Sequence, residues 1–202
     1  TASVAQRSGR EKELPEEYFS NLEKAYTWTL YLTTPDMSRP LLNDSWRVSA
    51  QKTFKNAVRL FPARKDFLWA ASDRREGDVP RQTSVFLDWS GYAVMRSGWD
   101  KEANYLVMDV GPLGYAGLMK YGHSHQDKLN VVMWAYGREI LFDNDGGNYE
   151  NSKWRMWARS SLAHNCVVVD GLSQYRGTPE DKDLDPVRVS QKPIDAGWKS
   201  TP

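Results

Sequence analysis

The chain concentrates its three histidines, His123, His125 and His164, in its two most motif-like segments, GHSHQDK and SLAHNCVVVDG. Residues two apart on an extended strand point to the same face, so the HxH spacing predicts that His123 and His125 lie side by side. Two imidazoles on one face can share a metal ion or divide metal binding and substrate binding between them. A lone HxH is more often surface decoration or hydrogen-bonded core, but the third histidine and nearby carboxylates make a metal site the stronger interpretation.

A carboxylate would complete such a site. Asp143 closes the apolar run REILFD, and hairpin pairing of that run would bring it beside His125. Asp127 and Asp145 are the alternatives, and His164 supplies a further imidazole from a later segment. Nitrogen and oxygen ligands without a thiolate suit zinc, and manganese or iron would also be tolerated.

Helical periodicity fills the first part of the chain. Apolar residues recur at steps of three and four over 14–32 and 45–61, and a third short helix is predicted over 66–71. The intervening TTPDMSRPLLNDSW reads as a loop, because two prolines and an Asn-Asp pair interrupt the period. The polar stretch 72–82 ends the helical signal, and we place a domain boundary there, with a helical domain over 1–80.

From residue 84 onward the pattern changes to short apolar runs that end in glycine or polar turns. They are VFLDWSGYAVMRSG, NYLVMDVG, LNVVMWAYG, REILFD and NCVVVDG. Such runs predict five or six strands joined by short turns, hence an antiparallel sheet or sandwich over 84–202. The strand signal weakens after Thr178, so we expect the sandwich to be incomplete and the chain to be a fragment.

Several of these segments, in this order, resemble the core of heparinase II/III-like polysaccharide lyases. The resemblance covers about residues 84–175 and rests on SGYAVMRSGWD, NYLVMDVGPLG, GHSHQDKLNVVMWAYGREILFD and RSSLAHNCVVVDG. It implies an α+β fold in which the last helices of an α/α toroid precede an antiparallel β-sandwich. It also implies that His125, Asp143 and His164 hold a zinc ion and that His123 faces the sugar. The family commonly has a proline after the aspartate, whereas this chain has Asn144, which leaves Asp143 and Asp145 both open as ligands.

The chemistry that the resemblance implies is β-elimination at a uronic acid of an anionic polysaccharide, by a periplasmic or secreted enzyme. The adjacent carboxylate must be neutralised while a base removes the C5 proton. His123 suits either task, because an imidazole titrates near neutral pH. The acid that protonates the leaving oxygen is usually a tyrosine of the helical domain, expected upstream of Thr1, so this chain would hold half of an active site. Tyr121 and Tyr149 lie near the motif but are interpreted as packing or substrate-contact residues rather than as that acid.

The segment KWRMWARSS interleaves Arg155 and Arg159 with Trp154 and Trp157. Guanidinium groups grip carboxylates or sulfates and indole faces stack on sugars, so Arg155, Arg159 and the nearby Tyr149 are predicted to bind substrate. A loop whose tryptophans cap the sandwich explains the same pattern equally well.

Composition narrows the function classes. The formal net charge of +1 gives no field that would attract nucleic acid or an anionic membrane, and no apolar run approaches the roughly 18 residues of a membrane span. The single cysteine, Cys166, excludes an internal disulfide and is expected to be a buried thiol in the strand NCVVVDG. No oligomeric state follows from these features.

Two alternatives stay open at this stage. Gly117 ahead of the HxH resembles the first half of the cupin metal motif, although no glutamate follows at the cupin spacing. A non-catalytic carbohydrate-binding module with a metal that staples its sheet is the second, because a bound ion stabilises a small domain without catalysis.

Overall fold

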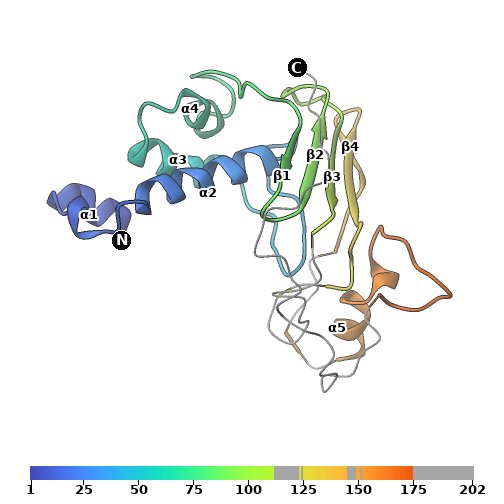
Figure 1. Cartoon of the computed structure of the whole chain (residues 1–202). Coiled ribbons are helices and arrows are strands. Elements are labelled where there is room, and N and C mark those ends of the chain that lie inside the picture. The colour runs from blue at the N-terminus through green and yellow to red at the C-terminus, as the bar shows by residue number, and fades with distance from the viewer. Residues whose placement is uncertain (112–122, 124, 145–148, 151, 175–202) are drawn as a thin grey trace.

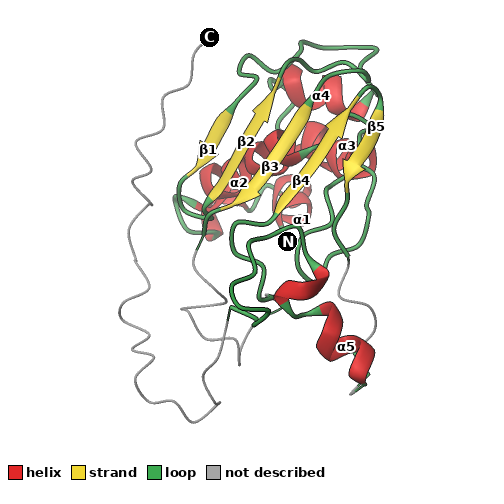
Figure 2. Ribbon diagram, turned by 90° about the vertical axis from the view of Figure 1, so that its right-hand side faces the viewer, coloured by secondary structure: helices red, strands yellow, loops and turns green. Residues whose placement is uncertain are grey.

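A computed structural model describes residues 1–111, 123, 125–144, 149–150 and 152–174 of the chain. Within them, a group of helices precedes and packs beside one antiparallel sheet (Figure 1). In the view onto the sheet, the helices α2, α3 and α4 lie behind one of its faces and α5 lies beyond one end (Figure 2). The predicted order of helices followed by strands is confirmed.

The helices are α1 (Ala2–Ser8), α2 (Tyr18–Leu32), α3 (Ala50–Leu60), α4 (Lys65–Ala71) and α5 (Lys153–Ala158), with 3-10 turns at Glu11–Glu13 and Ser161–Ala163. The helices predicted over 14–32 and 66–71 are confirmed with small shifts at their ends. The helix predicted over 45–61 starts five residues later, at Ala50, because the preceding backbone pairs Ser38 with Ser49 across a loop. The α1 and α5 helices had not been predicted.

The strands β1 (Val85–Leu87), β2 (Tyr92–Arg96), β3 (Tyr105–Asp109), β4 (Val131–Ala135) and β5 (Arg138–Leu141) form one sheet in the order β1-β2-β3-β4-β5. Every neighbouring pair is antiparallel, with Val94 opposite Val107 and Val107 opposite Val132 in the centre. Burial alternates along β3, where Tyr105, Val107 and Asp109 face inward. These five predicted strands are confirmed, and the alternating burial gives the sheet one buried face.

Two apolar clusters hold the helices to the sheet. The first lies among the helices and is centred on Phe54 and Phe67, with Trp99 reaching it from the sheet-bearing part. The second lies on the inner face of the sheet, where Val94, Val107 and Val132 pack against Leu32 at the end of α2. Because each cluster contains residues from both parts, the helices and the sheet share their core.

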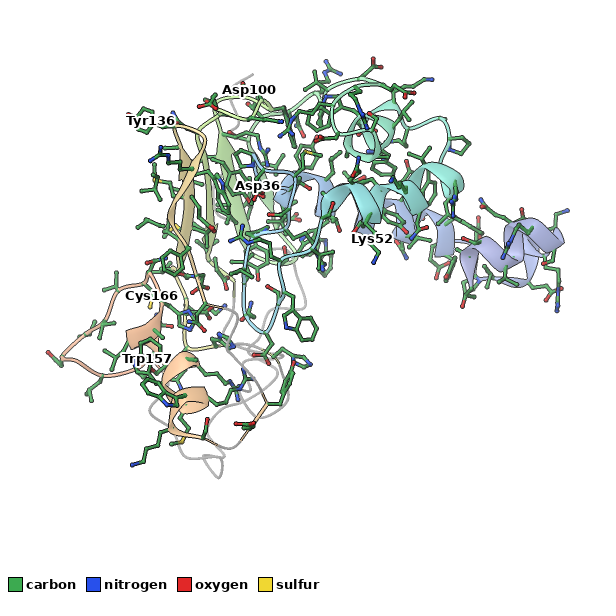
Figure 3. All side chains as sticks on the ribbon, turned by 180° about the vertical axis from the view of Figure 1, so that it is seen from behind. Asp36, Lys52, Asp100, Tyr136, Trp157 and Cys166 are labelled. Atoms are coloured by element: carbon green, nitrogen blue, oxygen red, sulfur yellow. The ribbon has the colours of Figure 1, made fainter. Side chains whose placement is uncertain are left out.

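The sixth predicted strand, NCVVVDG, is wrong. The backbone of this segment pairs with β4 at one point, where Val131 N donates to Asn165 O, and Val169 then turns back to pair with Leu172. Val167 and Val169 are exposed as a result. The expectation of a buried strand thiol is wrong for the same reason, because Cys166 is only half-buried on an irregular segment (Figure 3).

A buried guanidinium from the sheet caps the C-terminus of α2. Arg96 donates from its Nη2 atom to Tyr31 O at 2.6 Å and to Thr33 O at 2.9 Å, and its guanidinium lies 3.7 Å from the centre of the Trp99 ring. Burial lowers the pKa of Arg96 to about 10, so the side chain stays charged at neutral pH. A cation at a helix C-terminus is favourable, and here it also ties the helices to β2.

We expect Arg96→Met to destabilise the protein by about 2–4 kcal/mol, because two buried carbonyls lose a charged donor while the volume is nearly kept. Urea unfolding followed by tryptophan fluorescence measures the change. Arg138→Met, on an exposed position of β5, is the matched control and should change the free energy of unfolding by no more than about 0.5 kcal/mol. Equal effects of the two substitutions would contradict the capping role.

Candidate metal centre

The predicted site residues gather at one end of the sheet. At this end β3 stops at Asp109, β4 begins at Val131 and β5 stops at Leu141. His125 and Asp127 lie on the irregular segment that leads into β4, and His164 follows the 3-10 turn at Ser161–Ala163. The expectation that the HxH pair lies on a strand is wrong, since His123 and His125 are both outside the strands.

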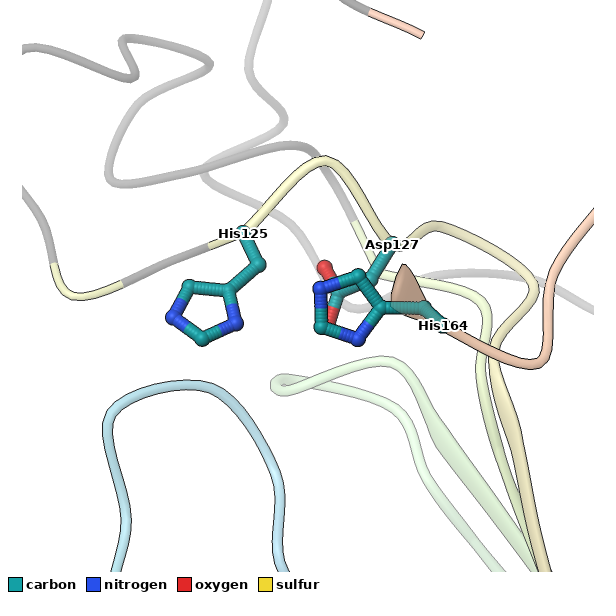
Figure 4. A group of neighbouring side chains, drawn as sticks. All are labelled: His125, Asp127 and His164. Carbon is teal, nitrogen blue, oxygen red and sulfur yellow. The ribbon is translucent and has the colours of Figure 1, made fainter. Parts of the chain in front are cut away.

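His125, Asp127 and His164 bring one ligand atom each to within 4.8 Å of one another. Figure 4 shows the two imidazoles and the carboxylate turned toward one another. The ring centres of the two histidines are 5.1 Å apart. All three are strongly shielded from solvent: His125 and Asp127 are 0% and 1% exposed, and the His164 side chain is 0% exposed.

The atoms that face this space have no hydrogen-bond partner in the described part of the chain. They are His125 Nδ1, His164 Nε2 and both carboxylate oxygens of Asp127. Buried polar atoms are nearly always paired, so unpartnered atoms on three grouped residues indicate a ligand with several bonding positions. A divalent cation satisfies imidazole nitrogens and carboxylate oxygens together, and the residues therefore fit the metal that the sequence implies.

A carboxylate holds the opposite nitrogen of each ring. Asp44 Oδ1 lies 2.9 Å from His125 Nε2, and Asp143 Oδ1 lies 2.6 Å from His164 Nδ1. Carboxylates behind metal-binding histidines fix the tautomer and orient the ring. The two pairs leave the inward nitrogens as lone-pair donors.

The protonation states also suit a cation. Burial lowers the pKa of His125 in spite of its hydrogen bond to Asp44, which favours the neutral ring that a metal requires. Burial raises the pKa of Asp127 to about 6. A carboxylate that is this poorly solvated gains much from a cation at its side.

The structure places Asp143 beside His164 rather than in the group of three. Besides its contact with His164, it accepts a hydrogen bond from Asn130 Nδ2 at 2.7 Å. Ligands about 2.1 Å from zinc at tetrahedral angles are roughly 3.4 Å apart. The 2.6 Å between Asp143 Oδ1 and His164 Nδ1 therefore fits a direct hydrogen bond better than a shared ion. Asp143 as the metal ligand stays a prediction, with Asp127 favoured by the geometry, and Asp145 lies outside the described residues.

Two residues of the helical part that sequence reasoning missed complete the site. Asn43 Oδ1 accepts a hydrogen bond from the His125 backbone at 3.1 Å, and Asp44 contacts both His123 and His125. They lie in the loop between α2 and α3, where the sequence indicated only an interruption of helix. No local pattern marks them, because their partners are about 80 residues away in the chain.

His123 stands at the open side of the centre with its side chain 74% exposed. Its Nδ1 lies 3.0 Å from Asp44 Oδ2 and 3.2 Å from the hydroxyl of Tyr149, which is itself exposed. The contact with the carboxylate favours the proton on Nδ1 and leaves the lone pair on Nε2. Tyr121, on the same segment as His123, lies outside the described residues.

The cationic residues predicted to bind substrate lie close to this centre. Arg155 donates to both oxygens of Asp44 at 2.6 and 2.7 Å, and its side chain is 10% exposed. Arg159 is half-buried, and its carbonyl accepts a hydrogen bond from Gln126 N at 3.0 Å. Trp154 and Trp157 are exposed on α5, so the interpretation in which they cap the sandwich is wrong for the described residues (Figure 3).

Comparison with known proteins assigns both parts of the chain. The family model of the heparinase II/III N-terminus matches residues 1–69, and that of the heparinase II/III-like C-terminal domain matches residues 79–192. The chain is 29% identical over 177 residues to a heparin-sulfate lyase of Pedobacter heparinus. The match covers 82% of this chain and 25% of that protein. It is 26% identical over 100 residues to an alginate lyase of Stenotrophomonas maltophilia. That match covers 45% of this chain and 12% of the lyase.

Solved structures agree with the sequence comparisons. The heparan sulfate lyase HepC of Pedobacter heparinus superposes with a TM-score of 0.77 at 26% identity, over 85% of this chain and 27% of that one. The chain thus spans about a quarter of the length of the two Pedobacter heparinus lyases. The predicted fold class, helices of an α/α toroid followed by an antiparallel β-sandwich, is confirmed, and the cupin alternative is left without support. The chain belongs to the heparinase II/III-like family.

Proposed function

We propose that this chain is the metal-bearing portion of a polysaccharide lyase that cleaves a uronic-acid-containing anionic glycan by β-elimination. One observation carries the proposal: two histidines and a carboxylate turn buried, unpartnered atoms toward one space, and an exposed histidine stands beside it. The names of the relatives supply the substrate class, since they act on heparin sulfate or alginate.

His125 and His164 would hold the ion with one carboxylate, which the geometry favours as Asp127. Zinc suits this donor set best, and manganese is the next choice. When bound, the ion supplies positive charge and rigidity beside the place where the uronate would lie. Removal of the C5 proton would fall to a residue of this chain.

His123 is the proposed catalytic residue. With Nδ1 held by Asp44, its Nε2 lone pair points outward and can accept the C5 proton of a uronate. The Tyr149 hydroxyl, in contact with the same ring, would donate a hydrogen bond to the sugar. Arg159 would contribute to binding the anionic chain, whereas Arg155 acts mainly through Asp44 because its guanidinium is engaged there.

The remainder of the active site, including the acid that protonates the leaving oxygen, is part of the proposal and lies outside this quarter of the relatives' length. A periplasmic or secreted location belongs to it as well. Among the described residues, no helix is long and apolar enough to cross a bilayer.

The test is made on a protein that joins this chain to the helical segment that would supply the acid. It follows the release of unsaturated uronic products from heparan sulfate and from alginate by ultraviolet absorbance. We expect activity on at least one polymer and a decrease in kcat/KM of about 100-fold or more for His123→Ala, the usual contribution of a general base. Tyr136→Phe, at the opposite end of the sheet, is a control that should leave the rate unchanged (Figure 3).

Binding of both polymers without cleavage would instead support the non-catalytic carbohydrate-binding module. Cleavage by His123→Ala at the wild-type rate would reject the role of this histidine while leaving the lyase activity in place. The two results are distinguishable because binding is measured separately, by calorimetry with size-fractionated oligosaccharides.

A further inference from the structure

The Asp44 carboxylate contacts His123, His125 and Arg155 at the proposed metal centre. Its Oδ1 lies 2.9 Å from His125 Nε2 and 2.6 Å from Arg155 Nη1, and its Oδ2 lies 3.0 Å from His123 Nδ1 and 2.7 Å from Arg155 Nη2. The side chain is only 4% exposed. Burial raises its pKa, but the hydrogen bonds from Arg155, His125 and His123 outweigh this and lower the pKa below its usual range.

We propose that Asp44 is a positioning residue: it fixes the tautomer of His125 and the orientation of His123, so that a loop of the helical part completes the metal centre of the sheet-bearing part. The inference rests on the proposed metal centre and deepens it. It assigns a task to a residue that itself contacts neither the ion nor the sugar.

The hydrogen bond between Asp44 and His125 selects one tautomer of the ring. A carboxylate can only accept, so Asp44 requires a proton on His125 Nε2 and thereby frees Nδ1 as a metal ligand. In the other tautomer the proton would stand on the nitrogen that faces Asp127 and His164. The ring would then have to lose that proton before a cation could bind.

The second oxygen of Asp44 orients His123. His123 and His125 contact the same carboxylate. The buried His125 ring helps to hold this carboxylate in place, so the exposed His123 ring loses its hydrogen bond to Asp44 if it turns. Arg155, on α5, donates to both oxygens of Asp44 and balances the charge of the carboxylate. Three segments far apart in the chain therefore meet at one side chain.

The loop itself is built to hold Asp44 there. Leu42 N donates to Ser45 Oγ at 2.8 Å, and Asp44 N donates to His123 O at 3.3 Å. Asn43 adopts a positive φ of 56°, a conformation that asparagine tolerates better than most residues. Asn43 also accepts a hydrogen bond from the His125 backbone, and Asp44 contacts the His125 ring. The loop therefore holds this histidine at both its main chain and its side chain.

The experiment compares wild type, Asp44→Ala, Asp44→Asn and, as a control in the same loop, Asp36→Ala. Asp36 pairs with Arg47, Thr34 and Ser38 away from the histidines (Figure 3). Zinc dissociation constants come from competition with a chromophoric chelator. The chain has three histidines, so long-range ¹H–¹⁵N spectra of the metal-free protein resolve the ring nitrogens and report each tautomer.

We expect His125 to be protonated on Nε2 in wild type and in Asp36→Ala. Asp44→Ala should lose this preference and raise the zinc dissociation constant by about 10- to 100-fold, the usual effect of removing such a partner. Asp44→Asn can still accept from Nε2, so it should keep the tautomer and show a smaller rise. A general loss of folding would change the melting temperature without this pattern.

Wild-type zinc affinity together with an unchanged His125 tautomer in Asp44→Ala would overturn the inference and leave the metal centre standing. No zinc binding by wild type would overturn the proposed centre itself, while the tautomers of the metal-free proteins would still decide what Asp44 does. If Asp44→Ala does not fold, Asp44→Asn decides: loss of the Nε2 proton preference of His125 together with the wild-type zinc dissociation constant would overturn the inference.

Discussion

His125→Ala and His164→Ala should each abolish metal binding, whereas the wild-type chain should bind about one equivalent of zinc, as a single site with two imidazoles and a carboxylate does. Each substitution removes one of three donors from a centre in which both rings are buried. The two remaining donors should bind zinc only weakly, as two side chains alone usually do. Given the free energies of structural zinc sites, we expect the zinc affinity to fall by about 1,000-fold or more.

The matched control is the third histidine. His123→Ala removes an imidazole from the same HxH motif, but its ring is exposed and its Nδ1 is directed at Asp44 instead of the grouped atoms. We expect this variant to keep roughly the zinc content of wild type, and at least about half of an equivalent. Elemental analysis after dialysis against a weak chelator measures all three variants, and equal losses in the three would contradict the assignment.

Metal removal should also lower the stability of the wild-type protein. A ligand that binds only the folded state at about 1,000 times its dissociation constant stabilises it by about 4 kcal/mol. Calorimetry with and without a strong chelator should therefore show a lower melting temperature for the metal-free wild type. The melting temperatures of His125→Ala and His164→Ala should not respond to the chelator.

The sequence was sufficient where the structure follows local rules. Alternating apolar residues placed the strands from Val85 to Leu141, because one buried face imposes a period of two. The same rule failed at NCVVVDG, whose valines have high β-propensity but no strand beside them in the described residues to extend the sheet. The propensity of a segment does not reveal whether a partner is available.

The candidate site divides in the same way. The histidines were found because their type and spacing are unusual. Hairpin pairing was expected to bring Asp143 beside His125, whereas the structure places its carboxylate against His164. Which carboxylate turns inward depends on side-chain packing around Asn130, and it was not decided by the sequence. Asp44 was missed because its contacts depend on how the helical part docks on the sheet, which is a tertiary property.

Asp127→Asn should stabilise the metal-free protein by about 3 kcal/mol at pH 8. Asp127 is buried, neither of its carboxylate oxygens has a partner among the described residues, and burial raises its pKa to about 6 from an ordinary 3.8. The folded state therefore binds this proton more tightly than the unfolded chain does. Each pKa unit corresponds to about 1.4 kcal/mol, which gives the expected gain for an uncharged amide of the same shape.

The sign of the effect sets its pH dependence. A group whose pKa is raised by folding stabilises the folded state below its unfolded pKa and loses that contribution as the pH rises through the folded pKa. The difference in unfolding free energy between Asp127→Asn and wild type should thus be near zero at pH 3.5, grow from about pH 4 to 6, and stay constant above. Chemical unfolding in chelator at several pH values measures it.

Zinc should reverse the order of the two proteins, and this reversal distinguishes the two candidate carboxylates. If Asp127 is the ligand, zinc stabilises wild type but not Asp127→Asn, so the residue lowers the stability of the empty fold and is retained for metal binding.

Asp143→Asn is the matched variant, because the Asp143 carboxylate is equally buried but already paired with Asn130 and His164. It should destabilise the metal-free protein, by about 1–3 kcal/mol, and weaken zinc binding only in part. Complete loss of zinc in Asp143→Asn with near-normal binding in Asp127→Asn would assign the ion to Asp143 and require the His164 ring to exchange its hydrogen bond for a metal bond.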